Sequence, residues 1–358
     1  MNSPVSVAII GASGYSGGEL LRLLAVRTDV SVVYATAQEF AGRAVGEVHP
    51  DLAGVLDLRF ESYTPEGRAP VDVAFLALPP GQAMQLVPQV RRWADRIIDL
   101  SGDFRLRSAD VYAQYYGHTH AAPELLADAV YGLPEISRDA IRTSRFIANP
   151  GCYPTAAVLA LAPALQEGLV DPGSLVVNAL SGVSGAGRSK AVELSFSEVN
   201  ENVRAYKVGM HQHTPEIESV LERVTGRSVR VSFVPHLLPI TRGIHATVLG
   251  ELTADVPEGD IRDLYRRFYR TSPFVRIREG LPQLQSVTRT NFCDIGLVVD
   301  RRTHRLILLS VIDNLLKGAA GQAVQNMNLL CGFPETRGLP GGRPEPVPLF
   351  PTSQEILA

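Results

Sequence analysis

The sequence predicts an α/β protein, with an N-terminal Rossmann-like domain on a parallel sheet and an α+β second domain on a mixed sheet. Three observations support this. A strand, a glycine loop and a helix open the chain, strands and helices then alternate up to about residue 150, and several strands follow one another after residue 174. Because 358 residues exceed one ordinary core, we expect two domains, 1–152 with 315–358 and 153–314.

The composition is that of a globular protein, with 45% hydrophobic and 20% charged residues. A net charge of −3 gives no support for a nucleic-acid or membrane partner. No apolar run reaches the roughly 18 residues of a membrane span, and no signal peptide is visible. Because Cys152, Cys293 and Cys331 are widely spaced and odd in number, we expect a reducing cytoplasm rather than disulfides.

The first element is an apolar run from Val5 to Ile10, typical of a buried parallel strand. A glycine loop follows, and an amphipathic helix is predicted from Gly18 to Val26. This order favours a pyrophosphate bound by the loop and the helix N-terminus, with a plain strand-to-helix turn as the alternative. The loop residues expected at the cofactor are Gly11, Ser13, Gly14, Tyr15, Ser16 and Gly17.

The second strand, Val30 to Thr36, ends without the acidic residue that usually accepts a hydrogen bond from the NAD ribose. Hydroxyl and amide groups tolerate a 2′-phosphate, and Arg43 follows closely. We therefore expect Thr36 at the cofactor and NADP rather than NAD, although Glu39 argues for the opposite preference.

The alternation continues with a strand from Val71 to Leu78, a helix from Gln82 to Trp93 and a strand from Arg96 to Leu100. Arg105 follows the last of these strands. Because strand ends border the ligand crevice of such sheets, we expect Arg105 to hold an anionic substrate group. A surface ion pair with Asp103 is the alternative.

Cys152 follows Gly151 directly, and a helical pattern runs from Ala156 to Glu167 with Pro154 suited to its start. A thiol at a helix N-terminus is favoured as the thiolate, which is the nucleophilic form. The alternative is a small buried hydrophobic residue. The glycine and proline around it favour the nucleophile.

Two polar segments follow in the second domain. The loop from Ser181 to Arg188 could bind a phosphate, shape a substrate pocket or be merely flexible. In the second segment, His211 and His213 precede a helix start, and Glu216 lies in its first turn. One histidine is expected as general acid and base for Cys152, and a metal site is disfavoured because no fourth ligand stands nearby.

The remaining strands are predicted at 174–180, 228–233, 243–252, 294–300 and 305–312, as a mixed or antiparallel sheet. Arg242 beside a glycine suits a carboxylate clamp. A helix rich in small residues is expected from Asp313 to about Leu330.

Six motifs together resemble the N-acetyl-gamma-glutamyl-phosphate reductase family, the arginine-pathway relatives of aspartate-semialdehyde dehydrogenase. The resemblance spans nearly the whole chain and has one small departure, Gly102 in place of alanine. The motifs are 11–17, 99–105, 149–155, 181–188, 211–217 and 313–323.

The resemblance implies NADPH-dependent reduction of an acyl phosphate to an aldehyde with release of inorganic phosphate. Cys152 would form a thioester, and His211, or else His213, would move protons. Arg105 would touch the phosphate and Arg242 the substrate carboxylate. Further contacts are expected to the substrate from Ser181, Ser184 and Glu216, and to the cofactor from Gly185, Asn314 and Lys317. A homotetramer or homodimer is also implied.

Three alternatives stay open. A lysine-pathway relative reduces aminoadipate phosphate on a carrier protein, but the runs Cys152-Tyr153-Pro154 and Gly182-Val183-Ser184-Gly185 favour the free substrate. A nucleotide-sensing regulator would not need the thiol and the histidines that this chain keeps. A hydrolase without cofactor would leave the glycine loop unexplained.

Overall fold

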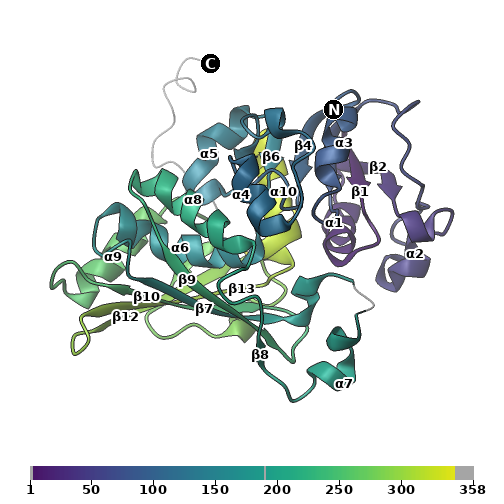
Figure 1. Ribbon diagram of the computed structural model, residues 1–358. Coiled ribbons are helices and arrows are strands. Elements are labelled where there is room, and N and C mark those ends of the chain that lie inside the picture. Colours follow the sequence, from purple (N-terminus) through teal and green to yellow (C-terminus); the bar gives the residue numbers. More distant parts are fainter. Residues whose placement is uncertain (1–2, 189–190, 343–358) are drawn as a thin grey trace, which may run out of the picture.

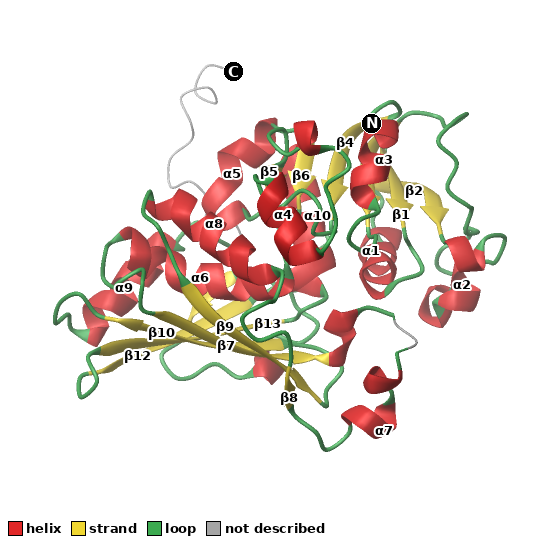
Figure 2. Ribbon diagram, viewed as in Figure 1, coloured by secondary structure: helices red, strands yellow, loops and turns green. Residues whose placement is uncertain are grey.

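The computed structural model describes residues 3–188 and 191–342 and contains two sheets with helices packed between and around them (Figures 1 and 2). The predicted tail from residue 343 onward lies outside the described residues. The first sheet is entirely parallel, in the order β2-β1-β3-β4-β6-β5. Its strands are β1 (Val5–Ile10), β2 (Val30–Thr36), β3 (Val71–Leu76), β4 (Ala94–Asp99), β5 (Val130–Tyr131) and β6 (Phe146–Ala148).

Alternate residues of these strands supply two hydrophobic cores, one on each face of the sheet. Val7 and Ile9 pack on the side of α1 and α10. Ala8 and Ile10 pack on the side of α3 and α4. The helices are α1 (Tyr15–Ala25), α2 (Val45–Val48), α3 (Ala83–Val90), α4 (Ala109–Tyr116), α5 (Pro134–Thr143) and α10 (Gly321–Leu330). This arrangement confirms the Rossmann-like parallel sheet expected for the N-terminal half.

The second sheet is mixed, as predicted, with the order β11-β12-β13-β10-β7-β9-β8. Its strands are β7 (Leu175–Gly182), β8 (Arg204–Ala205), β9 (Val231–Leu238), β10 (Ile244–Glu251), β11 (Val275–Ile277), β12 (Cys293–Asp300) and β13 (Arg305–Ile312). The helices of this half are α6 (Cys152–Gln166), α7 (Phe196–Val199), α8 (His213–Thr225) and α9 (Glu258–Phe268). No helix of the described part is long and apolar enough to cross a membrane.

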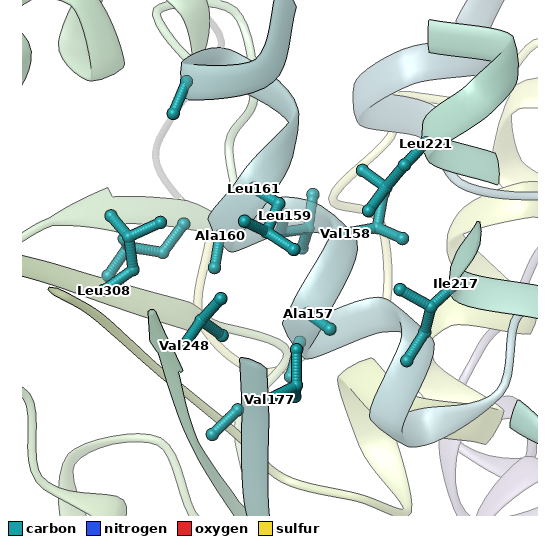
Figure 3. Close-up of a cluster of buried hydrophobic side chains, with 14 of the residues drawn as sticks. Ala157, Val158, Leu159, Ala160, Leu161, Val177, Ile217, Leu221, Val248 and Leu308 are labelled. Carbon is teal, nitrogen blue, oxygen red and sulfur yellow. The ribbon is translucent and has the colours of Figure 1, made fainter. Parts of the chain in front are cut away.

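Helix α6 lies on one face of the second sheet and is buried along nearly its whole length (Figure 3). Leu159 and Ala160 pack with Val177, Val248 and Leu308 of the sheet in one hydrophobic core. The alternate residues of the same strands face away from α6 and are half-buried. The sheet therefore has one covered face and one open face, and the core fixes α6, whose first residue is Cys152.

A proline inside α6 leaves one backbone carbonyl that a tyrosine from outside the helix satisfies. Pro163 has no N–H, so it leaves the carbonyl of Leu159 without the usual helical partner. The hydroxyl of Tyr269, which is buried, donates a hydrogen bond of 2.6 Å to that carbonyl oxygen.

We predict that Tyr269→Phe lowers the free energy of unfolding by about 1–3 kcal/mol, because the Leu159 carbonyl stays buried without a donor. Denaturant unfolding followed by circular dichroism measures this. Tyr115→Phe is the control, since the Tyr115 hydroxyl forms no hydrogen bond within the described part of the chain. Equal stability of the two variants would contradict the role assigned to Tyr269.

Candidate active site

Cys152 is the first residue of α6, and Gly151 is its N-cap with extended backbone. The helix thus begins earlier than the predicted Ala156. The cysteine faces a π-helical turn, Leu316–Ala320, just before α10. A Cβ on Gly318 of that turn would lie 2.8 Å from the Cβ of Cys152. Only glycine therefore allows this turn to pack against the thiol-bearing residue.

The carboxylate of Glu216 is fully buried and connects the elements around Cys152. Its Oε1 accepts hydrogen bonds of 2.8 Å from both the Gly151 N–H and the Tyr131 hydroxyl. Its Oε2 accepts from Nη1 of Arg105 at 3.2 Å. The sequence predicted that Glu216 contacts the substrate. These protein partners occupy its oxygens instead, because the side chain points from α8 into the interior.

Arg105 is held by two backbone carbonyls in addition to Glu216. Its Nε donates to the carbonyl of Asn149 and its Nη2 to that of Leu100, both at 2.8 Å. The alternative partner Asp103 is occupied elsewhere, accepting from Gly81 N and the Tyr112 hydroxyl at 2.7 Å. Although burial alone would lower the pKa of Arg105, the carboxylate of Glu216 raises it. Arg105 is therefore a fixed positive charge beside the helix that begins with Cys152.

The two histidines differ in which ring nitrogen carries the proton. Nη1 of Arg105 lies 3.3 Å from Nε2 of His213. A guanidinium can only donate, so this Nε2 accepts and the neutral ring carries its proton on Nδ1. In His211 the Nδ1 accepts from the backbone N–H of His213 at 3.0 Å, so its proton is on Nε2. Burial, and then neighbouring positive charge, lower the pKa of both rings, which makes both neutral at pH 7.

The thiol of Cys152 differs from the sequence-based expectation in its ionisation. Burial raises its pKa to about 11, and this outweighs the opposing effects of Arg105 and of nearby backbone N–H groups. The expectation of a favoured thiolate counted the helix terminus and left out the loss of solvent around the sulfur. In the substrate-free protein the thiol is therefore protonated at neutral pH.

A cavity of about 740 Å³ opens beside the thiol. Cys152, Ser181 and both histidines line it, together with Arg105 and Gly185. Arg204 and Lys207 also line it, and sequence reasoning did not identify them. Their segment carries no recognisable motif, although a positive φ of 47° at Lys207 shows that its backbone conformation is constrained.

A second cleft, of about 560 Å³, runs along the glycine loop. Gly11 has a φ of +87°, and a Cβ there would lie 2.4 Å from the carbonyl oxygen of Ala77, so this position requires glycine. Gly14 is the N-cap of α1 and provides no side-chain cap, so the first N–H groups of α1 are available to an anion. This arrangement fits the pyrophosphate of a nicotinamide dinucleotide. The cleft is lined by the residues predicted at the cofactor, namely Gly11, Ser13, Gly14, Tyr15, Ser16, Gly185 and Asn314. Ser184, predicted to contact the substrate, lines this cleft and not the larger cavity.

The two cavities meet at the thiol. Cys152, Arg105 and His213 line both of them. Asn314 helps to hold this junction, with its Oδ1 accepting from Gly243 N at 2.7 Å and its Nδ2 donating to Ser184 Oγ at 2.9 Å. A molecule in the larger cavity and one in the cleft would therefore both reach Cys152.

Besides Glu216, four predicted residues lie away from the cavity linings. Gly17 packs under the loop, where a Cβ would lie 2.5 Å from the Gly11 carbonyl oxygen. Thr36 is buried, and its Oγ1 accepts from Gly11 N at 3.1 Å. Both shape the loop from behind.

The other two residues, Arg242 and Lys317, form ion pairs with acidic side chains inside the protein. Arg242 pairs with Glu19 of α1 and lies 3.5 Å from Asp313, so it does not face the substrate cavity. Lys317 is fully buried, with its Nζ 2.7 Å from Glu135. The predictions placed Arg242 at the substrate and Lys317 at the cofactor. Both were wrong, because each long side chain turns instead toward an acidic neighbour. Within the described ranges no three His, Cys, Asp or Glu side chains are grouped to hold a metal ion.

Two family models match the chain, "Semialdehyde dehydrogenase, NAD binding domain" over residues 6–144 and "Semialdehyde dehydrogenase, dimerisation domain" over residues 152–314. A curated relative from Pelotomaculum thermopropionicum, named N-acetyl-gamma-glutamyl-phosphate reductase, is 52% identical over 340 residues, covering 94% of this chain and 98% of the relative. A relative of the same name from Citrifermentans bemidjiense is 48% identical over 351 residues, covering 97% and 100%.

Solved structures agree on the fold. Aspartate semialdehyde dehydrogenase II from Vibrio cholerae, complexed with ASA, aligns with a TM-score of 0.69 at 18% identity, covering 92% of this chain and 99% of that one. At this identity the likeness concerns the fold alone. From the family models and the curated relatives it follows that the chain belongs to the N-acetyl-gamma-glutamyl-phosphate reductase family, within the semialdehyde dehydrogenases.

Proposed function

We propose that this protein reduces N-acetyl-gamma-glutamyl phosphate to N-acetylglutamate semialdehyde with NADPH, releasing inorganic phosphate, as a step of arginine biosynthesis. The observation that carries the proposal is the meeting of the substrate cavity and the cofactor cleft at Cys152. A residue that both ligands reach can take the acyl group from one and present it to the other. The names of the relatives support the choice of acyl group.

As the thiol gives up its proton to the neighbouring histidine, its sulfur attacks the acyl carbon and the bond from that carbon to the phosphate oxygen breaks. Inorganic phosphate leaves, and a thioester remains on Cys152. The nicotinamide cofactor supplies hydride when bound. Addition of hydride to the thioester carbon gives a thiohemiacetal on the cysteine. This collapses to the aldehyde and the free thiol as the sulfur recovers a proton.

His213 is the better-supported proton carrier, although the sequence favoured His211. Its Nε2 accepts from Arg105 only over a long 3.3 Å contact, which a substrate can replace, and a Cβ on Gly151 would lie 2.5 Å from that nitrogen, so the ring sits against the residue before the thiol. In His211 the Nδ1 lone pair is taken by a backbone N–H and Nε2 is protonated. His211 thus fixes His213 and offers one N–H to the cavity.

With Arg242 turned away, the cations that line the substrate cavity are Arg105, Arg204 and Lys207. Arg105 lies at the thiol and suits the acyl phosphate. Lys207 donates to the side-chain oxygen of Gln212 at 3.2 Å, and Arg204 donates to the backbone carbonyl of Glu193 at 2.7 Å. Neither forms an ion pair within the described ranges, so both charges are available to the substrate carboxylate.

The same proposal covers the organisation of the chain. We assign 1–152 and 315–358 to cofactor binding and 153–314 to catalysis and assembly, in a cytoplasmic homodimer or homotetramer. The open face of the second sheet supports the assembly. Val176, Leu249 and Ile307 lie side by side on it in paired strands and are half-buried in a single chain.

The reverse reaction tests the proposal: N-acetylglutamate semialdehyde, NADP and phosphate, followed by NADPH absorbance. We expect NADPH formation that depends on phosphate. Cys152→Ser should lower the rate by about three orders of magnitude or more, because a serine hydroxyl is a far weaker nucleophile here. Activity that survives in Cys152→Ser would exclude the covalent step, and a wild type inactive on this substrate would turn attention to the carrier-bound aminoadipate phosphate.

The raised pKa of Cys152, about 11, predicts slow alkylation in the substrate-free protein at pH 7. Only the thiolate reacts, so the rate should climb about tenfold per pH unit and level off only above its pKa of about 11. Peptide mass spectrometry after iodoacetamide treatment separates Cys152 from Cys331. An alkylation rate that is already constant above pH 7 would contradict this, because it would mean that the thiolate is stabilised enough to outweigh burial.

The two histidines are separated by matched variants. We predict that His213→Asn lowers kcat by about 100- to 10,000-fold, the usual range for a lost general acid or base, and that His211→Asn lowers it about tenfold. Steady-state kinetics at saturating NADPH measure both. The reverse order would assign the proton transfer to His211.

A further inference from the structure

Arg188 belongs to the second half of the chain, and its side chain reaches the glycine loop of the first half. It follows Gly187, whose φ of +78° turns the backbone at the end of the loop after β7. Its Nη1 donates a 3.0 Å hydrogen bond to the carbonyl oxygen of Ser13 in the glycine loop. The guanidinium is thereby fixed across the cofactor cleft, which Arg188 also lines.

The surroundings of Arg188 are the residues that follow β2. Its guanidinium carbon lies 5.9 Å from the centroid of the Phe40 ring, and Gln38 and Glu39 line the same part of the cleft. In a nucleotide-binding sheet of this type, the end of the second strand faces the adenosine ribose. Arg188 thus brings a positive charge to the position at which NADP differs from NAD.

The other groups near this position are less suited to a phosphate. Arg43 lies on Phe40 as well, at 5.7 Å, but its Nε is 3.0 Å from a carboxylate oxygen of Glu47 and it does not line the cleft. Thr36 is buried under the loop. Glu39 is acidic and would repel a phosphate. In the described part of the chain Arg188 forms no ion pair with a carboxylate, so its charge is available.

We propose that Arg188 binds the 2′-phosphate of NADP(H) and sets the preference for NADP over NAD from the opposite side of the cleft. This inference rests on the proposed function. A planar guanidinium matches a phosphate with two parallel hydrogen bonds, and such charge-assisted bonds are among the stronger ones in proteins. The second half of the chain would then supply the positive charge for the 2′-phosphate, because no basic residue stands at the end of the second strand.

The test compares the dissociation constants of NADPH and NADH by calorimetry for wild type, Arg188→Ala, Arg188→Lys and Arg43→Ala. We expect Arg188→Ala to weaken NADPH binding about 10- to 100-fold and NADH binding less than about twofold. Arg188→Lys should restore part of the difference, and Arg43→Ala should keep it. The fragments 2′,5′-ADP and 5′-AMP should repeat the pattern without the nicotinamide.

Three results would overturn the inference. Equal weakening of both dinucleotides by Arg188→Ala would place the side chain on the shared pyrophosphate. Unchanged affinity for both dinucleotides in Arg188→Ala, or a preference lost in Arg43→Ala instead, would remove Arg188 from the phosphate. These outcomes leave the proposed function standing if wild type still binds NADPH. A wild type that binds neither dinucleotide would contradict the proposed function itself.

Discussion

The buried ion pair between Arg105 and Glu216 is the interaction on which the site depends. Arg105 follows a strand of the first sheet, Glu216 belongs to a helix that packs with α6, and the pair joins the two. The same carboxylate receives the N–H of Gly151, which precedes the nucleophile. Breaking such a pair leaves a buried charge, which costs about 3–5 kcal/mol. One carboxylate therefore sets the position of the helix start, the arginine and, through it, His213.

Close packing on the other side of Cys152 completes this constraint. Gly318 lies against the cysteine in a π-helical turn, a conformation that often occurs at functional sites. Asn314, two residues after β13, links the loop after β7 to Gly243, which precedes β10. The thiol is thus enclosed by segments that lie far apart in the sequence. This enclosure removes solvent and raises the pKa of Cys152, so the thiol is protonated at neutral pH in the substrate-free protein.

Sequence reasoning predicted the features that local patterns determine. Continuous apolar runs gave β1 and β2 with their observed bounds, and the glycine loop and the helix at Cys152 follow from turn and cap chemistry. It missed the short β5 and β6, whose pairing depends on neighbours. Sequence reasoning also did not predict where long side chains point. Arg242 and Lys317 turn toward Glu19 and Glu135, which are distant in sequence and close only after folding.

The central claim is that the acyl group passes through a thioester on Cys152. It is tested most directly by mixing the enzyme rapidly with N-acetylglutamate semialdehyde and NADP in the absence of phosphate. The account predicts a burst of one NADPH per active site, a mass increase on the peptide that contains Cys152, and further turnover only after phosphate is added. No burst without phosphate, together with normal turnover in its presence, would contradict the covalent intermediate.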